Sequence, residues 1–381
     1  MCSALGHGHP RVVEAVAEAM RTLAHANATY YNTAEIELAE ALAATFPEPL
    51  STCFFALSGS DANEAALGIA RAATGRYEVA SPHVSFHGLS DGPRALTFAG
   101  WRGGMSPPAP GSYAMLAPYC LRCPVRHTYP GCELACLEGS TALLDAQAAQ
   151  GLAAIITEPL FSAGGVIEPP PDWLPAVGEA AHERGALLVL DEGQTGLGKL
   201  GTMWAFEQQG VVPDVVTVSK HFGGGIPVSA VVTTKAIEEA AIDGGFAYAH
   251  SHSNDPIGCA AGLASIRAIE EDGLCARAEA IGARLRLRLE ELRARHPAIG
   301  DLRGRGCLQG VELVRPDGSA ATELGDPLRR ACLRGGLLFS VRRGGSVIRL
   351  VPPFSTTDEQ VDRAAEVLDA ALAEVATAVP A

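Results

Sequence analysis

The sequence has no long apolar run and no excess of basic residues. No stretch approaches the roughly 20 uninterrupted apolar residues that a membrane-spanning helix needs. The 29 basic residues are outnumbered by 43 acidic ones, and the formal net charge of −14 disfavours nucleic acid and anionic membranes as partners. The opening residues lack a charged segment followed by an apolar core, so they do not predict a secretory signal. We therefore expect a cytoplasmic protein that binds neither membranes nor nucleic acid.

Internal repeats and low-complexity linkers are also absent from the 381 residues. Apolar strands alternate with helical patterns over the first two thirds of the chain, with strands predicted at 52–57, 152–157, 186–190, 215–219 and 228–233. This alternation predicts an α/β fold in which a mostly parallel central sheet has helices on both faces. After about Pro256, long amphipathic helices and short strands indicate a smaller C-terminal α+β domain.

The same change in pattern suggests how the chain divides. We expect a large cofactor-binding domain over residues 26–258, a small C-terminal domain over 259–381, and an N-terminal segment over 1–25 that packs with the small domain.

The ten cysteines are unevenly distributed. Six stand singly among apolar neighbours, where cysteine packs as a small hydrophobe. The other four cluster in a segment rich in proline, glycine and tyrosine, and they are Cys120, Cys123, Cys132 and Cys136. Four thiolates could hold zinc or an iron–sulfur cluster, but the second spacing is not the two-residue knuckle of most zinc sites. We expect plain thiols in a reducing compartment and no metal, with a thiolate site as the alternative.

Two residues of opposite charge follow predicted strands. Asp191 closes the apolar run 186–190, and Lys220 closes the run 215–219. Either residue alone is better explained as an ordinary feature of an α/β protein. Together, with glycine-rich loops beside both, they are what pyridoxal phosphate needs, because a lysine forms a Schiff base with its aldehyde and an aspartate keeps its pyridine nitrogen protonated. The pair therefore predicts a site for pyridoxal 5'-phosphate.

Two loops offer further contacts for such a cofactor. Gly59 and Ser60 open a helix after the strand predicted at 52–57, and Ser58 precedes them. Backbone N–H groups at a helix N-terminus bind phosphate, although a glycine turn with a serine N-cap explains the same residues without a ligand. Phe86 follows a short strand and supplies a ring that could stack on the cofactor. Considered by itself, it would be interpreted as a core residue.

These residues belong to a series of motifs that extends from residue 1 nearly to the C-terminus. The chain resembles the class III aminotransferases of the fold-type-I pyridoxal-phosphate superfamily. Its motifs are most similar to those of 2,2-dialkylglycine decarboxylase and of generic bacterial class III aminotransferases. The matching segments are 6–10, 58–64, 86–88, 158–159, 191–196, 219–220, 223–225 and Arg349. The resemblance implies the fold of that superfamily and a homodimer whose active sites are shared between subunits.

The resemblance also implies a role for each site residue. Lys220 would be the Schiff-base lysine and the base that moves a proton between substrate and cofactor, while Asp191 would pair with the pyridine nitrogen. Arg349 would bind the substrate carboxylate. Ser251 would hold phosphate across the subunit boundary. The other cofactor-binding positions are Ser58, Gly59, Ser60, Phe86, His87, Glu158 and Gln194.

Two departures from the family pattern bear on the substrate. In the branch that acts on γ- and ω-amino acids, a glutamate shortly after the Glu-Pro pair partners the carboxylate-binding arginine, whereas here Ala163 occupies that place. This favours α-carboxylate substrates, or an amine donor with pyruvate as acceptor. Gly193 replaces a small side chain under the cofactor ring, which predicts a looser face there.

We therefore expect an enzyme, an aminotransferase that moves an amino group from an amino acid or amine donor to a 2-oxo acid acceptor. Decarboxylation-dependent transamination of the dialkylglycine decarboxylase type is the alternative, because the two reactions differ in which bond to the α-carbon lies perpendicular to the cofactor plane. A dimer that binds the cofactor without turnover is a third hypothesis. The presence of Lys220 and Asp191 disfavours it.

Overall fold

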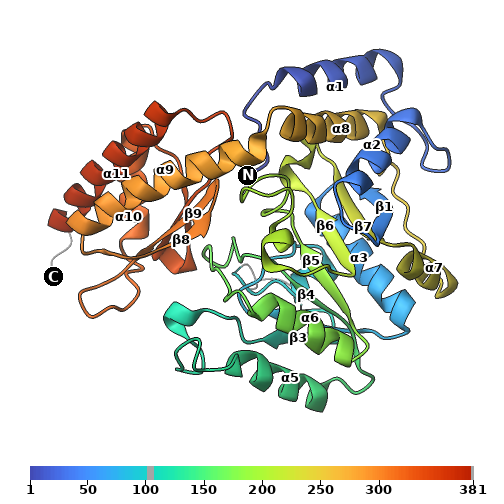
Figure 1. Ribbon diagram of the computed structural model, residues 1–381, viewed down its shortest axis with the longest axis horizontal. Helices are drawn as coiled ribbons and strands as arrows, with labels where there is room; N and C mark the ends of the chain where they lie inside the picture. Colours follow the sequence, from blue (N-terminus) through green and yellow to red (C-terminus); the bar gives the residue numbers. More distant parts are fainter. Residues whose placement is uncertain (101–106, 379–381) are drawn as a thin grey trace.

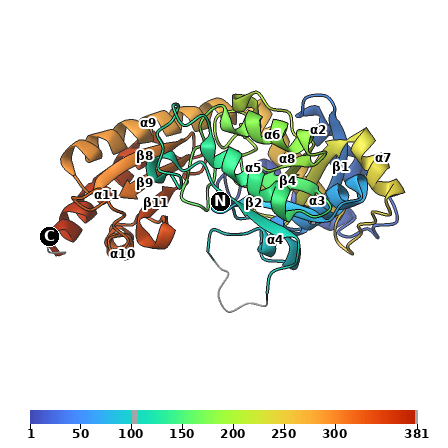
Figure 2. The same cartoon turned by 90° about the horizontal axis from the view of Figure 1, so that it is seen from below.

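The computed structural model describes residues 1–100 and 107–378. It contains a seven-stranded sheet and a separate four-stranded sheet. The four-stranded sheet and its helices lie at one end of the molecule, and the N-terminus lies between the two parts in both views (Figure 1, Figure 2). None of the helices in the described ranges combines the length and the apolar content that a membrane crossing requires.

The large sheet is mostly parallel. Its strands follow the spatial order β1-β7-β6-β5-β4-β2-β3, and β7 alone among them runs antiparallel to its neighbours. The strands are β1 (Leu50–Ala56), β2 (Glu78–Pro82), β3 (Ser112–Met115), β4 (Leu152–Thr157), β5 (Leu187–Asp191), β6 (Val215–Val218) and β7 (Ser229–Thr234). The carboxyl ends of six strands therefore point to the same edge of the sheet.

Helices cover both faces of this sheet. The helices of the whole chain are α1 (Pro10–Thr22), α2 (Thr33–Ala44), α3 (Gly59–Thr74), α4 (Asp91–Ala95), α5 (Ala135–Gln147), α6 (Trp173–Glu183), α7 (Lys235–Asp243), α8 (Pro256–Glu271), α9 (Leu274–Arg295), α10 (Gly325–Arg334) and α11 (Asp358–Ala378). Short 3₁₀ turns lie at η1 (Cys120–Arg122), η2 (Ala205–Gln209), η3 (Lys220–Gly223) and η4 (Arg343–Gly345).

Alternation along the strands explains the two layers. Successive strand residues point to opposite faces, so Val189 of β5 packs in the cluster that contains α3 and α7, while Leu188 and Leu190 pack in the cluster that contains α2, α6 and α8. The continuous apolar runs of β4, β5 and β6 are buried at nearly every position, which is typical of parallel strands covered on both faces. The prediction of a mostly parallel sheet with helices on both sides is confirmed.

The C-terminal sheet is antiparallel, with the order β10-β11-β9-β8. Its strands are β8 (Ile299–Arg305), β9 (Leu308–Leu313), β10 (Ser340–Arg342) and β11 (Val347–Leu350). The helices α9, α10 and α11 lie beside this sheet (Figure 1). This arrangement confirms the predicted smaller α+β part.

The N-terminal segment contacts both parts of the molecule. The helix α1 packs on α8 (Figure 1), and Phe354 donates its backbone N–H to the carbonyl of Ala4 at 2.7 Å. The proposed division at residues 25 and 258 stays a prediction, since α8 packs against both α1 and α2.

Most predicted elements match the structure to within two residues at each end. The strand predicted at 186–190 is β5 (Leu187–Asp191), and the strand predicted at 228–233 is β7 (Ser229–Thr234). Two strands of the small sheet were not predicted. The strand β8 carries glycine, aspartate and arginine in place of an apolar run, and β10 has three residues, so neither gives a periodic signal.

Candidate active site

The predicted site residues gather at one edge of the large sheet. Five of them stand at or just after the carboxyl end of a parallel strand, which is where ligands bind in open α/β sheets. Ser58 follows β1, Phe86 follows β2, Glu158 follows β4, Asp191 ends β5, and Lys220 follows β6. Strands far apart in the sequence therefore bring these side chains together.

Two cavities meet at this edge. The first has a volume of about 310 Å³, and the predicted residues that line it are Ser58, Gly59, Ser60, Phe86, His87, Asp191 and Lys220. The second has a volume of about 570 Å³ and is lined by Gln194 and Arg349 together with Phe86 and Lys220. Phe86 and Lys220 thus line both. We call the first the Asp191 cavity and the second the Arg349 cavity.

Asp191 lies in the Asp191 cavity as the acceptor of three hydrogen bonds. Its Oδ1 accepts from the Gly193 N–H at 3.0 Å, and its Oδ2 accepts from Asn63 Nδ2 at 2.9 Å and from His87 Nδ1 at 3.0 Å. Burial alone would raise the pKa of this carboxyl. The hydrogen bond and charge of His87, the charge of Lys220 and the hydrogen bond of Asn63 together bring the pKa below its ordinary value. Asp191 is therefore ionised although it is buried.

A second layer of polar residues fixes the groups that hold Asp191. Asn63 donates to the carbonyl of His87 at 2.6 Å and accepts from Thr217 Oγ1 at 2.8 Å. His87 Nε2 lies 3.1 Å from Ser81 Oγ. The ring is therefore held by Asp191 at Nδ1 and by Ser81 at Nε2, so the contact with Ser81 orients His87 toward Asp191.

Lys220 has an unusual backbone conformation. Its φ is +58°, in the left-handed region that side chains other than those of glycine, asparagine and aspartate rarely adopt. Such a conformation costs about 1–3 kcal/mol and is found mainly at functional sites. The chain has two other lysines. Lys199 is buried near the ring of Phe354, and Lys235 is exposed beside Glu238.

Two glycines leave room beside Lys220. A Cβ at Gly59 would lie 2.8 Å from Ser219 Oγ, and a Cβ at Gly193 would lie 2.5 Å from the same atom and 3.0 Å from Asp191 Oδ1. Both distances to the serine are shorter than side chains tolerate, so a larger residue at either position would displace Ser219. Glycine at 193 accordingly allows Ser219 and the Asp191 carboxylate to lie close to this part of the backbone.

The helix α3 directs its N-terminus into the Asp191 cavity. Gly59 and Ser60 are its first two residues, and the first N–H groups of a helix have no acceptor within the helix. Ser58 is the N-cap, because its Oγ accepts from the Asp61 N–H at 3.3 Å and donates to the Asp61 carboxylate at 2.8 Å. The Ser58 hydroxyl is thus already committed to the cap, whereas Gly59 and Ser60 present backbone donors.

Glu158 lies buried behind Phe86. Its Oε1 accepts from the Phe86 N–H at 3.0 Å, and its Oε2 accepts from the Ser162 N–H at 3.2 Å. Burial, followed by the charge of Asp191, raises the pKa of Glu158 to about 8. The carboxyl therefore connects the loop of Phe86 to the loop of Ser162 and does not line either cavity.

Arg349 extends from β11 into the Arg349 cavity. Its Nη1 donates to Gln194 Oε1 at 2.8 Å and to Ser162 Oγ at 3.0 Å, and its Nε donates to Ser340 Oγ at 3.0 Å. Burial and the nearby Arg342 lower the pKa of Arg349 to about 10. Ala163 lines the same cavity, and Arg349 makes no ion pair with a carboxylate of the described residues. Gln194 is thus a neutral neighbour that aligns the guanidinium.

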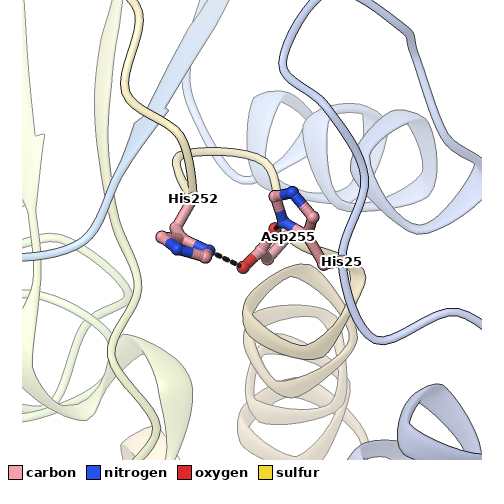
Figure 3. Close-up of side chains that lie close together, drawn as sticks. All are labelled: His25, His252 and Asp255. Atoms are coloured by element: carbon pink, nitrogen blue, oxygen red, sulfur yellow. Dashed lines mark hydrogen bonds and ion pairs between the residues drawn. The ribbon is translucent and has the colours of Figure 1, made fainter.

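Ser251 lies apart from both cavities. It is exposed in the turn before α8, and the next residue, His252, is one of two histidines that converge on the carboxylate of Asp255 (Figure 3). Asp255 accepts from His25 Nδ1 at 2.5 Å and from His252 Nδ1 at 2.6 Å. These contacts tie the turn to the segment between α1 and α2.

The four clustered cysteines line one small cavity with Tyr119, Tyr129 and several prolines, and all ten cysteines are free thiols. Within the described ranges, the side chains whose geometry could hold a metal ion are His25, His252 and Asp255. The cysteines are not among them.

Several residues that organise the site were not predicted as site residues. They are Asn63, Ser81, Ser162 and Thr217. Asn63 stands inside the motif 58–64 and lies just over one turn after the start of α3, so its position facing the sheet was the available signal. Ser81 and Thr217 occupy strand positions whose side-chain direction depends on the sheet register, which sequence does not specify.

The donor set of the Asp191 cavity fits pyridoxal phosphate. An amine, an ionised carboxylate, an aromatic ring and a helix N-terminus line one space of about 310 Å³. These groups match the aldehyde, the pyridine nitrogen, the ring face and the phosphate of the cofactor. Gly59, which lines this space, adds no side-chain atoms to it.

The family model for class-III aminotransferases matches residues 1–372. An uncharacterised aminotransferase of Schizosaccharomyces pombe is 36% identical over 382 residues, which cover 98% of this chain and 84% of that protein. Acetylornithine aminotransferase of Mycolicibacterium smegmatis is 35% identical over 368 residues, which cover 97% and 86%.

A solved structure agrees with these relatives. An amine transaminase from an uncultivated Pseudomonas species, in its PLP-bound form, has a TM-score of 0.88 at 29% identity, over 97% of this chain and 88% of that chain. The match confirms the predicted fold and cofactor class. The chain belongs to the class-III aminotransferases, which are enzymes that depend on pyridoxal phosphate.

Proposed function

We propose that Lys220, Asp191 and Arg349 carry out amino transfer in this enzyme, from an amino acid or amine donor to a 2-oxo acid. The observation that carries this proposal is the position of Lys220, which lines both the Asp191 cavity and the Arg349 cavity. The amine is therefore next to the space that fits the cofactor and next to the arginine that suits a substrate carboxylate.

Asp191 would act on the pyridine ring of the bound cofactor. Pyridoxal phosphate, when bound, supplies an aldehyde for attachment and a ring that draws electrons from the substrate. Asp191, kept ionised by His87 and Asn63, would keep the ring nitrogen of the bound cofactor protonated. The buried network around Asp191 keeps the carboxylate in one orientation.

Lys220 has two tasks. When the cofactor is bound, Lys220 Nζ would hold its aldehyde in the resting enzyme, and during turnover the free amine would be the base that moves a proton between the substrate α-carbon and the cofactor. A base must lie within hydrogen-bond reach of both positions. The location of Lys220 at the junction of the cavities meets this requirement.

The remaining residues position the two molecules. Gly59 and Ser60 would bind the cofactor phosphate through their backbone N–H groups at the start of α3, and Phe86, which lines the same cavity, would stack on the ring. Arg349 binds the substrate α-carboxylate through its guanidinium face, with Gln194 and Ser162 aligning that face from behind.

We also propose that the enzyme is a homodimer with shared active sites. Ser251 is exposed and lines neither cavity of its own chain, which leaves its hydroxyl available to the partner's cofactor phosphate. Exposed aromatic residues accompany this turn, because Tyr30 is 73% and Tyr31 is 87% exposed, and Asn254 donates to the Tyr30 carbonyl at 3.4 Å. Exposed aromatic clusters are typical of protein interfaces.

The test of the catalytic assignment is a half-reaction. The holoenzyme is mixed with an amino donor without an acceptor, and the 2-oxo acid released is counted per active site. We expect one equivalent from the wild type and from Lys235→Ala, whose lysine is exposed, and none within the same time from Lys220→Ala. Equal release from Lys220→Ala would disprove the assignment. Release of carbon dioxide with 2-aminoisobutyrate would favour the decarboxylating alternative.

A further inference from the structure

Three guanidinium groups line the Arg349 cavity. Arg349 comes from β11, Arg342 ends β10, and Arg343 begins the turn between these strands. A single carboxylate of the substrate needs one guanidinium for a bidentate contact. The cavity therefore contains more positive charge than one α-carboxylate requires.

The hairpin register brings Arg342 and Arg349 to the same face of the sheet. Ser340 pairs with Arg349, and Arg342 lies two positions further along β10, so Arg342 and Arg349 are diagonal neighbours at roughly 7–8 Å between their backbones. Burial lowers the pKa of Arg342, and the charge of Arg342 contributes to the lowered pKa of Arg349. The two cations thus repel one another inside the cavity.

No carboxylate of the described residues forms an ion pair with any of the three arginines. Arg342 donates to the Val341 carbonyl at 2.8 Å, which uses one of its five N–H donors. Asp326 also lines the cavity, but its carboxylate is paired with Arg329 at 3.1 Å. In this cavity of about 570 Å³, Arg349 is buried and Arg342 is half-buried without the anionic partner that such groups ordinarily have, and Arg343 is exposed at its edge.

Arg343 contacts Tyr119 and the loop of Gly164 and Gly165. Its guanidinium lies 4.6 Å from the centre of the Tyr119 ring, and its Nη1 donates to the Gly164 carbonyl at 3.4 Å. Its aliphatic stem passes Gly165, where a Cβ would lie 2.8 Å from Arg343 Cδ. Tyr119 in turn donates its hydroxyl to the buried Glu312. These contacts restrict Arg343 without neutralising its charge.

We propose that Arg342 and Arg343 form a second anion subsite, so that one substrate of this enzyme carries a side-chain carboxylate in addition to its α-carboxylate. This inference rests on the proposed function, in which Arg349 binds the α-carboxylate. The substrate class is a dicarboxylic 2-oxo acid and the acidic amino acid that it becomes. From Ala163 the sequence had favoured α-carboxylate substrates, or an amine donor with pyruvate as acceptor, and it did not choose between acceptors with one and two carboxylates.

Binding of two inert acids to the holoenzyme tests the subsite without turnover. Glutarate and butyrate have the same carbon chain and differ by one carboxylate. Calorimetry should show roughly tenfold tighter binding of glutarate by the wild type. Arg342→Gln with Arg343→Gln should abolish this preference, and Arg349→Gln should weaken both acids. The matched control is Arg315→Gln, whose arginine is paired with Glu323 outside the cavity, and it should bind as the wild type does.

The kinetics of the acceptor half-reaction provide a second test of the subsite. The ratio of kcat/KM for 2-oxoglutarate to that for pyruvate should fall about tenfold or more in the double variant, while the value for pyruvate changes little. Equal binding of glutarate and butyrate by the wild type would overturn the proposal, as would an equal fall for both acceptors. Tighter binding of 3-phosphonopropionate than of glutarate would overturn the assignment to a carboxylate.

The two proposals can fail separately. Amino transfer that survives in Lys220→Ala would overturn the catalytic assignment, while the glutarate preference would still report on Arg342 and Arg343. Lys220-dependent transfer without that preference would overturn the subsite alone.

Discussion

The two cavities that meet at Lys220 differ in how their charges are compensated. In the Asp191 cavity, the single buried carboxylate accepts three hydrogen bonds, and the groups that donate them are themselves hydrogen-bonded. In the Arg349 cavity, three arginines have neutral neighbours and no carboxylate partner among the described residues. One cavity is electrostatically complete, and the other lacks anions.

This difference in charge compensation indicates that the Asp191 cavity serves the catalytic step and the Arg349 cavity serves the choice of substrate. A buried network whose members are all satisfied keeps one orientation and one charge state, which suits a cofactor that performs the same step in every turnover. Unpaired guanidiniums favour whichever anion enters the cavity, which suits the choice of substrate. Changes in the first cavity should lower turnover for all substrates, and changes in the second should alter their ranking.

The largest effect that we predict is that of Asp191→Asn. Replacing a buried, hydrogen-bonded charge costs about 3–5 kcal/mol, so kcat should fall at least about 100-fold for every donor and acceptor. Asp145→Asn makes the same change at an exposed position that pairs with Arg184 and should retain activity. Steady-state kinetics with several acceptors measure both. A loss confined to one acceptor would contradict the division of roles.

Arg349→Gln should have a smaller effect and a different signature. Removing one partner of a charged contact costs about 2–5 kcal/mol, which predicts a rise in KM of about 30-fold or more for carboxylate substrates. Substrate amines without a carboxylate should be affected far less. The ratio of kcat/KM for an amino acid and for the matching amine is the measurement, and an equal loss for both would contradict the assignment.

His87→Gln should reduce activity less than Asp191→Asn. Glutamine keeps a donor near Asp191 but leaves Ser81 without the ring nitrogen, and an unsatisfied buried group costs about 1–3 kcal/mol. We expect a fall in kcat of about tenfold and a shift of the acid limb of the pH–rate profile to higher pH, because Asp191 loses a contact that lowers its pKa. An unchanged acid limb would show that His87 does not hold Asp191 ionised.

The smallest prediction concerns stability. Burial raises the pKa of Glu158 to about 8, whereas an unfolded glutamate titrates near ~4.3. At pH values between these two pKa values, the folded protein therefore binds a proton that the unfolded protein has lost. The contribution of this protonation to the free energy of unfolding is fully present below the unfolded pKa and is lost as the pH rises through about 8.

Thermal unfolding from pH 5 to 9 should accordingly show a wild-type slope that Glu158→Gln lacks. A glutamine cannot titrate, so the variant should become relatively more stable as the pH rises. Parallel profiles for the two proteins would show that Glu158 is ionised throughout this range.

The sequence predicted the Asp191 cavity better than the Arg349 cavity, for physical reasons. Asp191 and Lys220 follow continuous apolar strands, and parallel strands bring such residues to the same sheet edge. The second cavity depends on the hairpin β10–β11, where β10 has three residues and Arg343 adopts a φ of +52°. A short strand and a left-handed arginine leave no periodic signal.

The hydrogen-bond networks of the site were the other feature that the sequence did not predict. Asn63, Ser81 and Thr217 stand on three different elements, and their convergence on His87 and Asp191 depends on the register of β2 and β6 in the sheet. The same holds for Glu158, which the sequence placed at the cofactor but which lies behind Phe86. The sequence predicted that Glu158 is near the site but did not predict Asn63, Ser81 and Thr217 as site residues, and the sheet register determined what each of them contacts.

The most direct test uses the three lysines of the chain, Lys199, Lys220 and Lys235. Reduction of the holoenzyme with borohydride fixes the cofactor to the lysine that carries it, and peptide mass spectrometry then identifies that lysine. Our account predicts the label on the peptide that contains Lys220, and its disappearance in Lys220→Ala. A label on the peptide of Lys199 or Lys235 would contradict it.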